Sequence, residues 1–201
     1  MEIDPLETIE KAKESRSHDR AAMRLNTIVA ITVAILATFM GICKVKDDNI
    51  VQSMQQAQAN KLDHWAYYQA RNIREDIARA TLVQLRFNAT TESQENQEHY
   101  QAAIETYEKM AVDQKKKRDE LKVLAERDQK EYDDLNFRDD QFDLSDALIA
   151  IAISLLAVTA LTQKRWLYVM ALVPTGFGIF MGLAGLFGLP IHPAALIRIL
   201  S

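Results

Sequence analysis

The chain has 201 residues, of which 48% are hydrophobic and 26% are charged, and its formal net charge is −4 at pH 7. These averages are typical of a soluble protein, but the charged and apolar residues are segregated along the chain and not mixed. The one cysteine, Cys43, excludes an intramolecular disulfide and a zinc site built on thiolates.

Residues 1–25 come before the first apolar run. Asp4 followed by Pro5 predicts a helix start, with a capping acid and a first-turn proline. The apolar side of this segment is thin, so we predict a cytoplasmic amphipathic helix that is solvated or docked on a partner. Its apolar side comprises Leu6, Ile9, Ala12 and, further along, Ala21 and Met23.

Three runs are apolar enough to cross a bilayer, which needs ~20 residues. They are 26–45, 144–163 and 166–189. We therefore predict an all-α membrane protein with three transmembrane helices. Buried core helices of a soluble protein are the alternative, although such helices are usually shorter and amphipathic. The acid-rich leading segment disfavours a cleaved signal peptide, and Ile42 before Cys43 fits a lipoprotein signal poorly.

Basic residues near the run ends predict the orientation, because cytoplasmic flanks are enriched in Lys and Arg. One side carries Arg16, Arg20, Arg24 and the short turn Gln163-Lys164-Arg165-Trp166; the other carries Lys44, Lys46, Lys61, Arg138 and Arg198. We expect the N-terminus in the cytoplasm of a bacterial cell and the segment 46–143 in the periplasm or outside the cell. The bias is modest, and the reverse topology stays open.

Segment 46–143 contains no Pro and no Gly, the strongest helix breakers. A turn-like cluster at 88–94 predicts the tip of an antiparallel coiled-coil hairpin. Helices spanning 46–87 would reach roughly 60 Å at ~1.5 Å per residue.

Alternating spacings of four and three residues predict the seams of this hairpin. The returning seam is Tyr100, Ile104, Tyr107, Ala111, Gln114, Arg118, Leu121, Ala125, Asp128, Tyr132 and Leu135, and the outgoing seam is expected at Ala66, Ala70, Ile73, Ile77, Ala80, Gln84 and Phe87. Polar seam positions can specify register or partners. Two interpretations remain open: a self-sufficient hairpin with a weak middle, or helices completed by other subunits.

An aromatic patch lies on the outgoing helix, His64-Trp65-Ala66-Tyr67-Tyr68-Gln69-Ala70-Arg71. Dense aromatic side chains favour burial against a partner. We therefore take as candidate partner or oligomer contacts Trp65, Tyr67, Tyr68, Gln69 and Arg71, together with Tyr100 and Tyr107 of the returning helix. Plain packing within the hairpin is the alternative.

Two further features lie in the apolar runs. Asp146 is an acid near the start of the second run, where it is either a functional intramembrane acid or a group that reaches water with Asp139, Asp140 and Asp143. In the third run, Gly178, Gly182 and Gly185 can let helices approach closely in lipid, against another run or a neighbouring subunit. After this run, residues 190–201 are expected to form a short interfacial helix.

No convergent catalytic set, phosphate-binding loop or nucleotide fingerprint is present, so we expect no enzyme activity, no cofactor and no small-molecule substrate. His64 and His99 have no further metal-binding side chains at a suitable spacing, so we expect no metal site. Acids flank the run Lys115–Arg118, which disfavours nucleic-acid binding. The leading expectation is a structural or assembly protein, a homo-oligomer or an accessory subunit of a membrane complex. A transport component, either a small channel or an efflux adaptor, is the alternative; Thr27, Thr32 and Thr38 hint at it.

The layout and the run Trp65-Ala66-Tyr67-Tyr68-Gln69-Ala70-Arg71 resemble a bacterial membrane protein family of unknown function, domain of unknown function 4337. The resemblance covers nearly the whole chain. It implies this topology and brings no activity with it.

Overall fold

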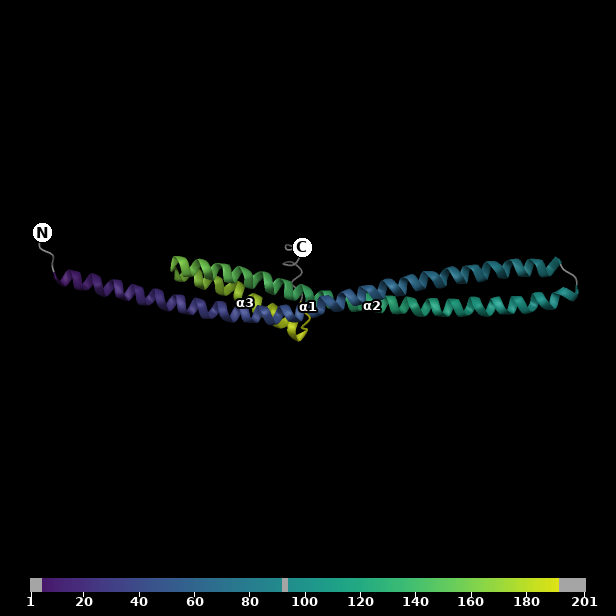
Figure 1. Ribbon diagram of the computed structural model, residues 1–201, viewed down its shortest axis with the longest axis horizontal. Coiled ribbons are helices and arrows are strands. Elements are labelled where there is room, and N and C mark those ends of the chain that lie inside the picture. Colours follow the sequence, from purple (N-terminus) through teal and green to yellow (C-terminus); the bar gives the residue numbers. More distant parts are fainter. Residues whose placement is uncertain (1–4, 92–93, 192–201) are drawn as a thin grey trace. The chain divides into compact units, whose positions relative to one another are not determined.

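The computed structural model describes the backbone of residues 5–91 and 94–191, with the side chains of residues 20–90 and 97–191. Three helices follow one another, α1 (Pro5–Thr91), α2 (Gln94–Thr162) and α3 (Arg165–Phe187) (Figure 1). No strand occurs within the described ranges, so the all-helical prediction is confirmed.

The first two helices are long, with 87 residues in α1 and 69 in α2. Since residues 46–143 offer no helix breaker, the backbone hydrogen bonding of α1 continues from Pro5 without interruption until Thr91. The next helix, α2, begins at Gln94. Side chains of residues 1–19, and all of the expected C-terminal helix beyond Ile191, lie outside the described residues.

The chain divides into two compact units. The first comprises Met1–Val51 and Asn136–Ser201, and the second comprises Gln52–Leu135. We call them the three-helix unit and the hairpin.

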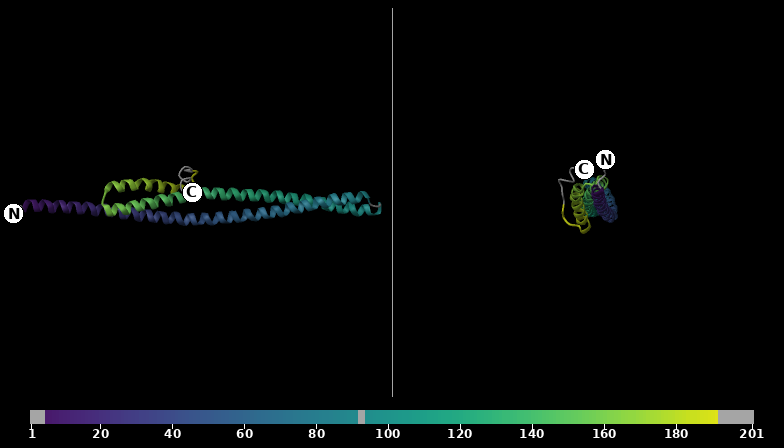
Figure 2. Two further views of the ribbon diagram at one scale, coloured as in Figure 1. Left: turned by 90° about the horizontal axis from the view of Figure 1, so that it is seen from above. Right: turned by 90° about the vertical axis from the view of Figure 1, so that its left-hand side faces the viewer.

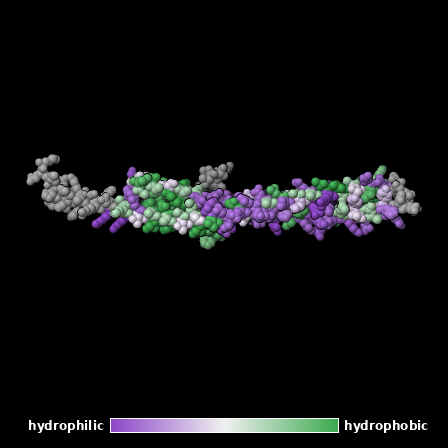
Figure 3. Space-filling view, viewed as in Figure 1, coloured by the Kyte–Doolittle hydropathy of each residue, from purple (hydrophilic) through white to green (hydrophobic). Residues whose placement is uncertain are grey.

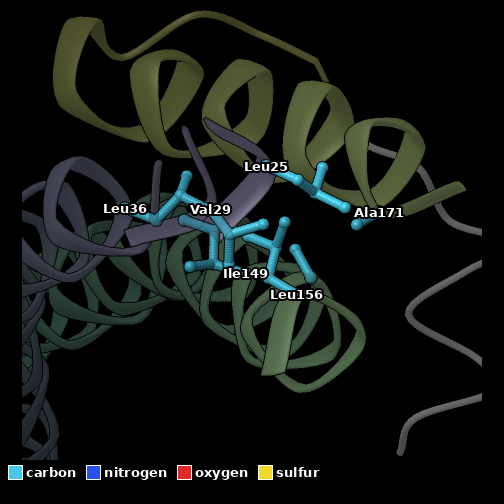
Figure 4. Packing of buried hydrophobic residues seen from close by; sticks show 7 residues of the cluster. Leu25, Val29, Leu36, Ile149, Leu156 and Ala171 are labelled. Carbon is cyan, nitrogen blue, oxygen red and sulfur yellow. The ribbon is translucent and has the colours of Figure 1, made fainter. Parts of the chain in front are cut away.

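The three-helix unit packs the beginning of α1, the end of α2 and all of α3 around one apolar core (Figure 4). Its buried residues are Leu25, Val29, Leu36, Ile149, Ala152, Leu156 and Ala171. Around them pack partly buried side chains such as Phe39 and Tyr168. All three apolar runs thus contribute to a single core.

Many apolar side chains of this unit are nevertheless not buried. In the most apolar windows of the three helices, only 17%, 33% and 39% of the residues are buried. Figure 3 shows apolar side chains gathered over this unit, whereas hydrophilic ones dominate the hairpin surface. By length and composition, each of the three helices could cross a membrane.

Two residues with positive φ lie at the ends of α2 and α3. Gln163, at φ 58°, lies in the turn between these helices, and its backbone N–H donates to the carbonyl of Thr159. Gly188 adopts φ 64° and ends α3, where the N–H of Leu189 bonds the carbonyl of Ala184. Glycine suits this left-handed position because it carries no Cβ.

In the hairpin, the second part of α1 and the first part of α2 run side by side in opposite directions (Figure 2). The expected returning seam is confirmed, because all of its residues, from Tyr100 to Leu135, are buried or half-buried. The expected outgoing seam is wrong. Its members Ile73, Ile77 and Phe87 are 58%, 59% and 69% exposed.

The face of α1 that packs on α2 is another row with the same alternating spacing. It comprises Met54, Ala57, Lys61, His64, Tyr68, Arg71, Glu75, Ala78, Leu82, Leu85 and Ala89, all buried or half-buried. This row contains more polar residues than the expected one. It is buried because polar partners on α2 face it, and a paired polar group costs far less to bury than an unpaired one.

Candidate functional site

The middle of the hairpin is held by polar pairs between its helices. His64 Nδ1 lies 2.6 Å from Asp128 Oδ2, and Asp128 is only 1% exposed. Arg71 Nη1 donates to Gln114 Oε1 at 3.0 Å, and Lys61 donates to Gln129. These pairs fix one register, because a shift of either helix would leave the buried groups unpaired.

Glu75 is the most highly coordinated of these groups. It is 3% exposed, and its carboxylate accepts from two guanidinium groups. Arg118 Nη1 of α2 donates to Oε2 at 2.7 Å, and Arg79 Nε of α1 donates to Oε1 at 2.9 Å. A carboxylate buried in this way depends on both bonds, since desolvating an unpaired charge costs several kcal/mol.

The aromatic patch divides between two faces of α1. Trp65 and Tyr68 are half-buried and meet edge to face, with ring centroids 5.1 Å apart. Arg71, on the same face, bonds Gln114 as described above. Tyr67 is 62% exposed and Gln69 is also exposed, so these two face away from α2. Of the expected contact residues on α1, three therefore pack within the chain and two remain available.

The two expected tyrosines of α2 lie within the hairpin. Tyr107 packs on the apolar cluster formed by Ala78, Leu82, Ile104 and Ala111, and Tyr100 is half-buried.

The three-helix unit contains a cluster of acids on α1 and α2. Asp47 is 4% exposed, and its Oδ2 accepts from Lys44 Nζ at 2.7 Å. Burial, a hydrogen bond to Asp47 and the charges of Asp143, Asp47 and Asp140 raise the pKa of Asp139 to about 7. Burial and the charge of Asp47 also raise the pKa of Asp143.

The negative charges of Asp143, Asp47 and Asp140 favour a proton on Asp139, because that proton removes one of several like charges. Asp146 lies one helical turn beyond Asp143 and is half-buried. The structure places it beside this cluster, with Lys44 and Asp47 acting on it electrostatically.

The glycines of α3 lie where the helices of this unit come closest. A Cβ on Gly178 would stand 2.8 Å from Ile149 Cγ1 and 3.3 Å from the backbone nitrogen of Ile149. A Cβ on Gly182 would stand 2.7 Å from Phe39, and one on Gly185 2.9 Å from Phe142. All three expected packing glycines therefore face α1 or α2 of the same chain.

Polar side chains join α2 to the end of α3. Gln141 is fully buried, and its Nε2 donates to the carbonyls of Leu189 and Ile191 at 2.8 and 2.7 Å. Arg138 Nη2 donates to the carbonyl of Gly185 at 3.1 Å. These bonds tie α2 to the last turn of α3 and to the residues that follow it.

The threonines of α1 bond their own helix. Thr27, Thr32 and Thr38 donate to the carbonyls of Met23, Ile28 and Ala34, each at 2.8–2.9 Å. The Thr32 hydroxyl also lies 3.2 Å from that of Tyr168. All three hydroxyls thus bond within α1, and that of Thr32 also reaches α3.

Sequence reasoning missed Glu75, Asp47 and Gln141. Glu75 could have been found, because it lies on a row with alternating spacing that also contains His64, Arg71 and Ala78. Gln141 has no such signal, since its partners are backbone carbonyls far along the chain. No group of three or more His, Cys, Asp or Glu side chains within the described part of the chain is arranged to hold a metal ion.

A family model described as "Domain of unknown function (DUF4337)" matches residues 25–188. Neither the curated proteins nor the solved structures contain a match to this chain.

Proposed function

The chain belongs to the DUF4337 family, and because membership carries no activity, we propose from the structure itself that it is a non-enzymatic structural or assembly protein of the bacterial inner membrane. It acts as a homo-oligomer or as an accessory subunit of a larger membrane complex. The hairpin makes the protein contacts and the three-helix unit is the anchor.

The exposed apolar surface of the three-helix unit is the observation that carries this proposal. Ile35 on α1, Leu161 on α2 and Val173 on α3 are 60%, 85% and 60% exposed, although each belongs to an apolar run. A soluble monomer rarely leaves a contiguous apolar patch of more than a few hundred Å² in water. In a bilayer, these apolar side chains are no longer exposed to water. Helices also satisfy the hydrogen bonds of their backbone groups internally, which the lipid interior requires.

The polar termini of the anchor support the same proposal. Trp166 follows Lys164 and Arg165 at the turn, and aromatic and basic residues are enriched at membrane interfaces. The N-terminus and this turn then face the cytoplasm, and the hairpin lies in the periplasm or outside the cell. The acid cluster around Asp139 lies at the outer interface.

The hairpin supports the assignment to assembly over catalysis. Its buried polar groups bond to one another between its own helices, as His64 does with Asp128 and Glu75 with Arg118. What it presents outward is a long surface with exposed apolar and aromatic residues such as Tyr67 and Ile77. Surfaces of this kind bind proteins, and neither nucleic acid nor a small-molecule substrate is part of the proposal.

The test is the mass and composition of the native particle after gentle detergent extraction from its own membrane. Two or more copies, or a constant ratio to another membrane protein, would support the proposal. A single chain without companions would contradict it. Recovery of the chain in the soluble fraction would contradict membrane anchoring.

A further inference from the structure

The face of α1 that points away from α2 carries a second row with heptad spacing. The row comprises Ala66, Ala70, Ile73, Ile77, Ala80, Gln84 and Phe87, all of them exposed. Beside it lie Leu62, Tyr67 and Val83, which are 61%, 62% and 70% exposed. We call this surface the outer seam.

A helix with two such rows can pair on two faces. The first row of α1 is already occupied by α2, through groups such as Glu75, Ala78 and Leu82. An apolar stripe at heptad spacing does not persist on a solvated helix face, which is normally polar. The outer seam therefore requires a further helix.

The outer seam is large enough for a stable contact. Its six large apolar side chains, each more than half exposed, present on the order of 800 Å², which is the area that each partner buries in a standard interface.

We propose that the outer seam binds the outer seam of a second copy of this chain, in parallel and in register. This inference rests on the proposed function, since two copies anchored in one membrane present α1 with the same direction. Each seam residue then meets its own counterpart. Ile73 and Ile77 form the apolar centre, and Gln84 pairs with Gln84 of the second copy as a register-setting polar layer.

The charges beside the seam fit the parallel arrangement. In a parallel pair, a flanking residue meets the residue five positions further along on the other helix. Leu62 then makes an apolar contact with Tyr67 of the second copy, and Gln69 forms a hydrogen bond with the charged Arg74. The parallel arrangement also pairs Asp76 with Thr81, so that no like charges meet.

An antiparallel pair is less favourable. Centred on Ile77, it would bring Asp76 close to Asp76 of the second copy, and like charges at an interface are repulsive. The parallel pair avoids this contact.

The test uses the full chain in its native membrane, with Cys43 replaced by Ala and one new cysteine. Residues in register at a parallel seam lie near the ~6 Å Cα separation of a disulfide, so mild oxidation of Ile73→Cys should yield roughly tenfold more covalent dimer than the control. The control is Val123→Cys, because Val123 is 64% exposed but lies on α2, away from the outer seam.

Three results would overturn the proposal: no dimer with Ile73→Cys, equal dimer with Val123→Cys, or a covalent product that contains a different protein. A second variant, Ile73→Glu with Ile77→Glu, changes only exposed side chains, so the hairpin should stay helical while the native particle loses copies. An unchanged particle mass would also contradict the inference.

The proposed assembly function and the pairing of the outer seams can fail separately. If the native particle contains several chains but Ile73→Cys forms no dimer, the assembly function stands and the outer seam is wrong. If the particle is one chain, both are wrong.

Discussion

Asp139 makes the stability of the three-helix unit depend on pH. The pKa of Asp139 is raised to about 7 from the ordinary value of 3.8. The folded protein therefore holds a proton that the unfolded chain releases between these two values. Its stability must fall as pH rises through this window and level off above it, because the unfolded state binds fewer protons there.

The variant Asp139→Asn keeps the shape of the side chain and removes the charge. We expect it to raise the thermal stability of the detergent-solubilised protein at pH 8, by roughly 1–2 kcal/mol after allowance for partial exposure, and to change it little at pH 4. Thermal unfolding of both proteins at the two pH values measures this. An equal difference at both would show that the pKa of Asp139 is not raised in the folded protein.

Glu75 is the residue on which the hairpin depends most. Replacing it with Ala removes the buried carboxylate that accepts from both Arg118 of α2 and Arg79 of α1, so we expect the free energy of opening of the hairpin to fall by about 2–3 kcal/mol. Hydrogen exchange of the backbone amides around residue 75 reports this change. The control Glu120→Ala alters an exposed acid on α2 and should stay within about 0.5 kcal/mol of the unchanged protein.

At the scale of single elements, α3 depends on where its glycines lie. Gly178 contacts the backbone of Ile149 on α2, while a Cβ on Gly176 would meet nothing within 4 Å. Backbone cannot move aside as a side-chain end can, so the two positions should respond differently to the same change.

We therefore expect Gly178→Ala to lower the stability of the three-helix unit by about 1–3 kcal/mol through overpacking. Gly176→Ala should leave it unchanged or raise it by up to ~1 kcal/mol, because alanine is the better helix former. Thermal unfolding in detergent compares the two. Equal effects would mean that α3 does not pack on α2 at Gly178.

At the scale of the whole molecule, the proposed topology assigns the hairpin tip and the turn between α2 and α3 to opposite sides of the membrane. In this topology Arg16, Arg20 and Arg24 share the cytoplasmic side with Lys164 and Arg165.

Single cysteines can test this orientation after Cys43 is replaced. A membrane-impermeant thiol reagent applied to sealed, right-side-out cells should label Ser93→Cys, and it should label Thr162→Cys only after permeabilisation. The opposite pattern would invert the topology, with the hairpin in the cytoplasm.

The sequence by itself determined the order and type of the helices, since long stretches without Pro or Gly and three apolar runs allow little else. It also determined the seam of α2, where one row of alternating spacing is clearly more apolar than its neighbours. For α1 two rows compete, one containing Ile73 and Ile77 and the other Glu75 and Ala78. The apolar content favours the first of these, and the structure buries the second.

Only the tertiary structure decided between these rows. The contribution of a buried polar residue to stability depends on its partner. The partners of His64 and Glu75 are Asp128 and Arg118, which lie far away along the chain. The same holds for the raised pKa of Asp139 and for the bonds from Gln141 to the residues after α3. Periodicity is a local property that one segment reveals, whereas pairing is a property of two segments that folding brings together.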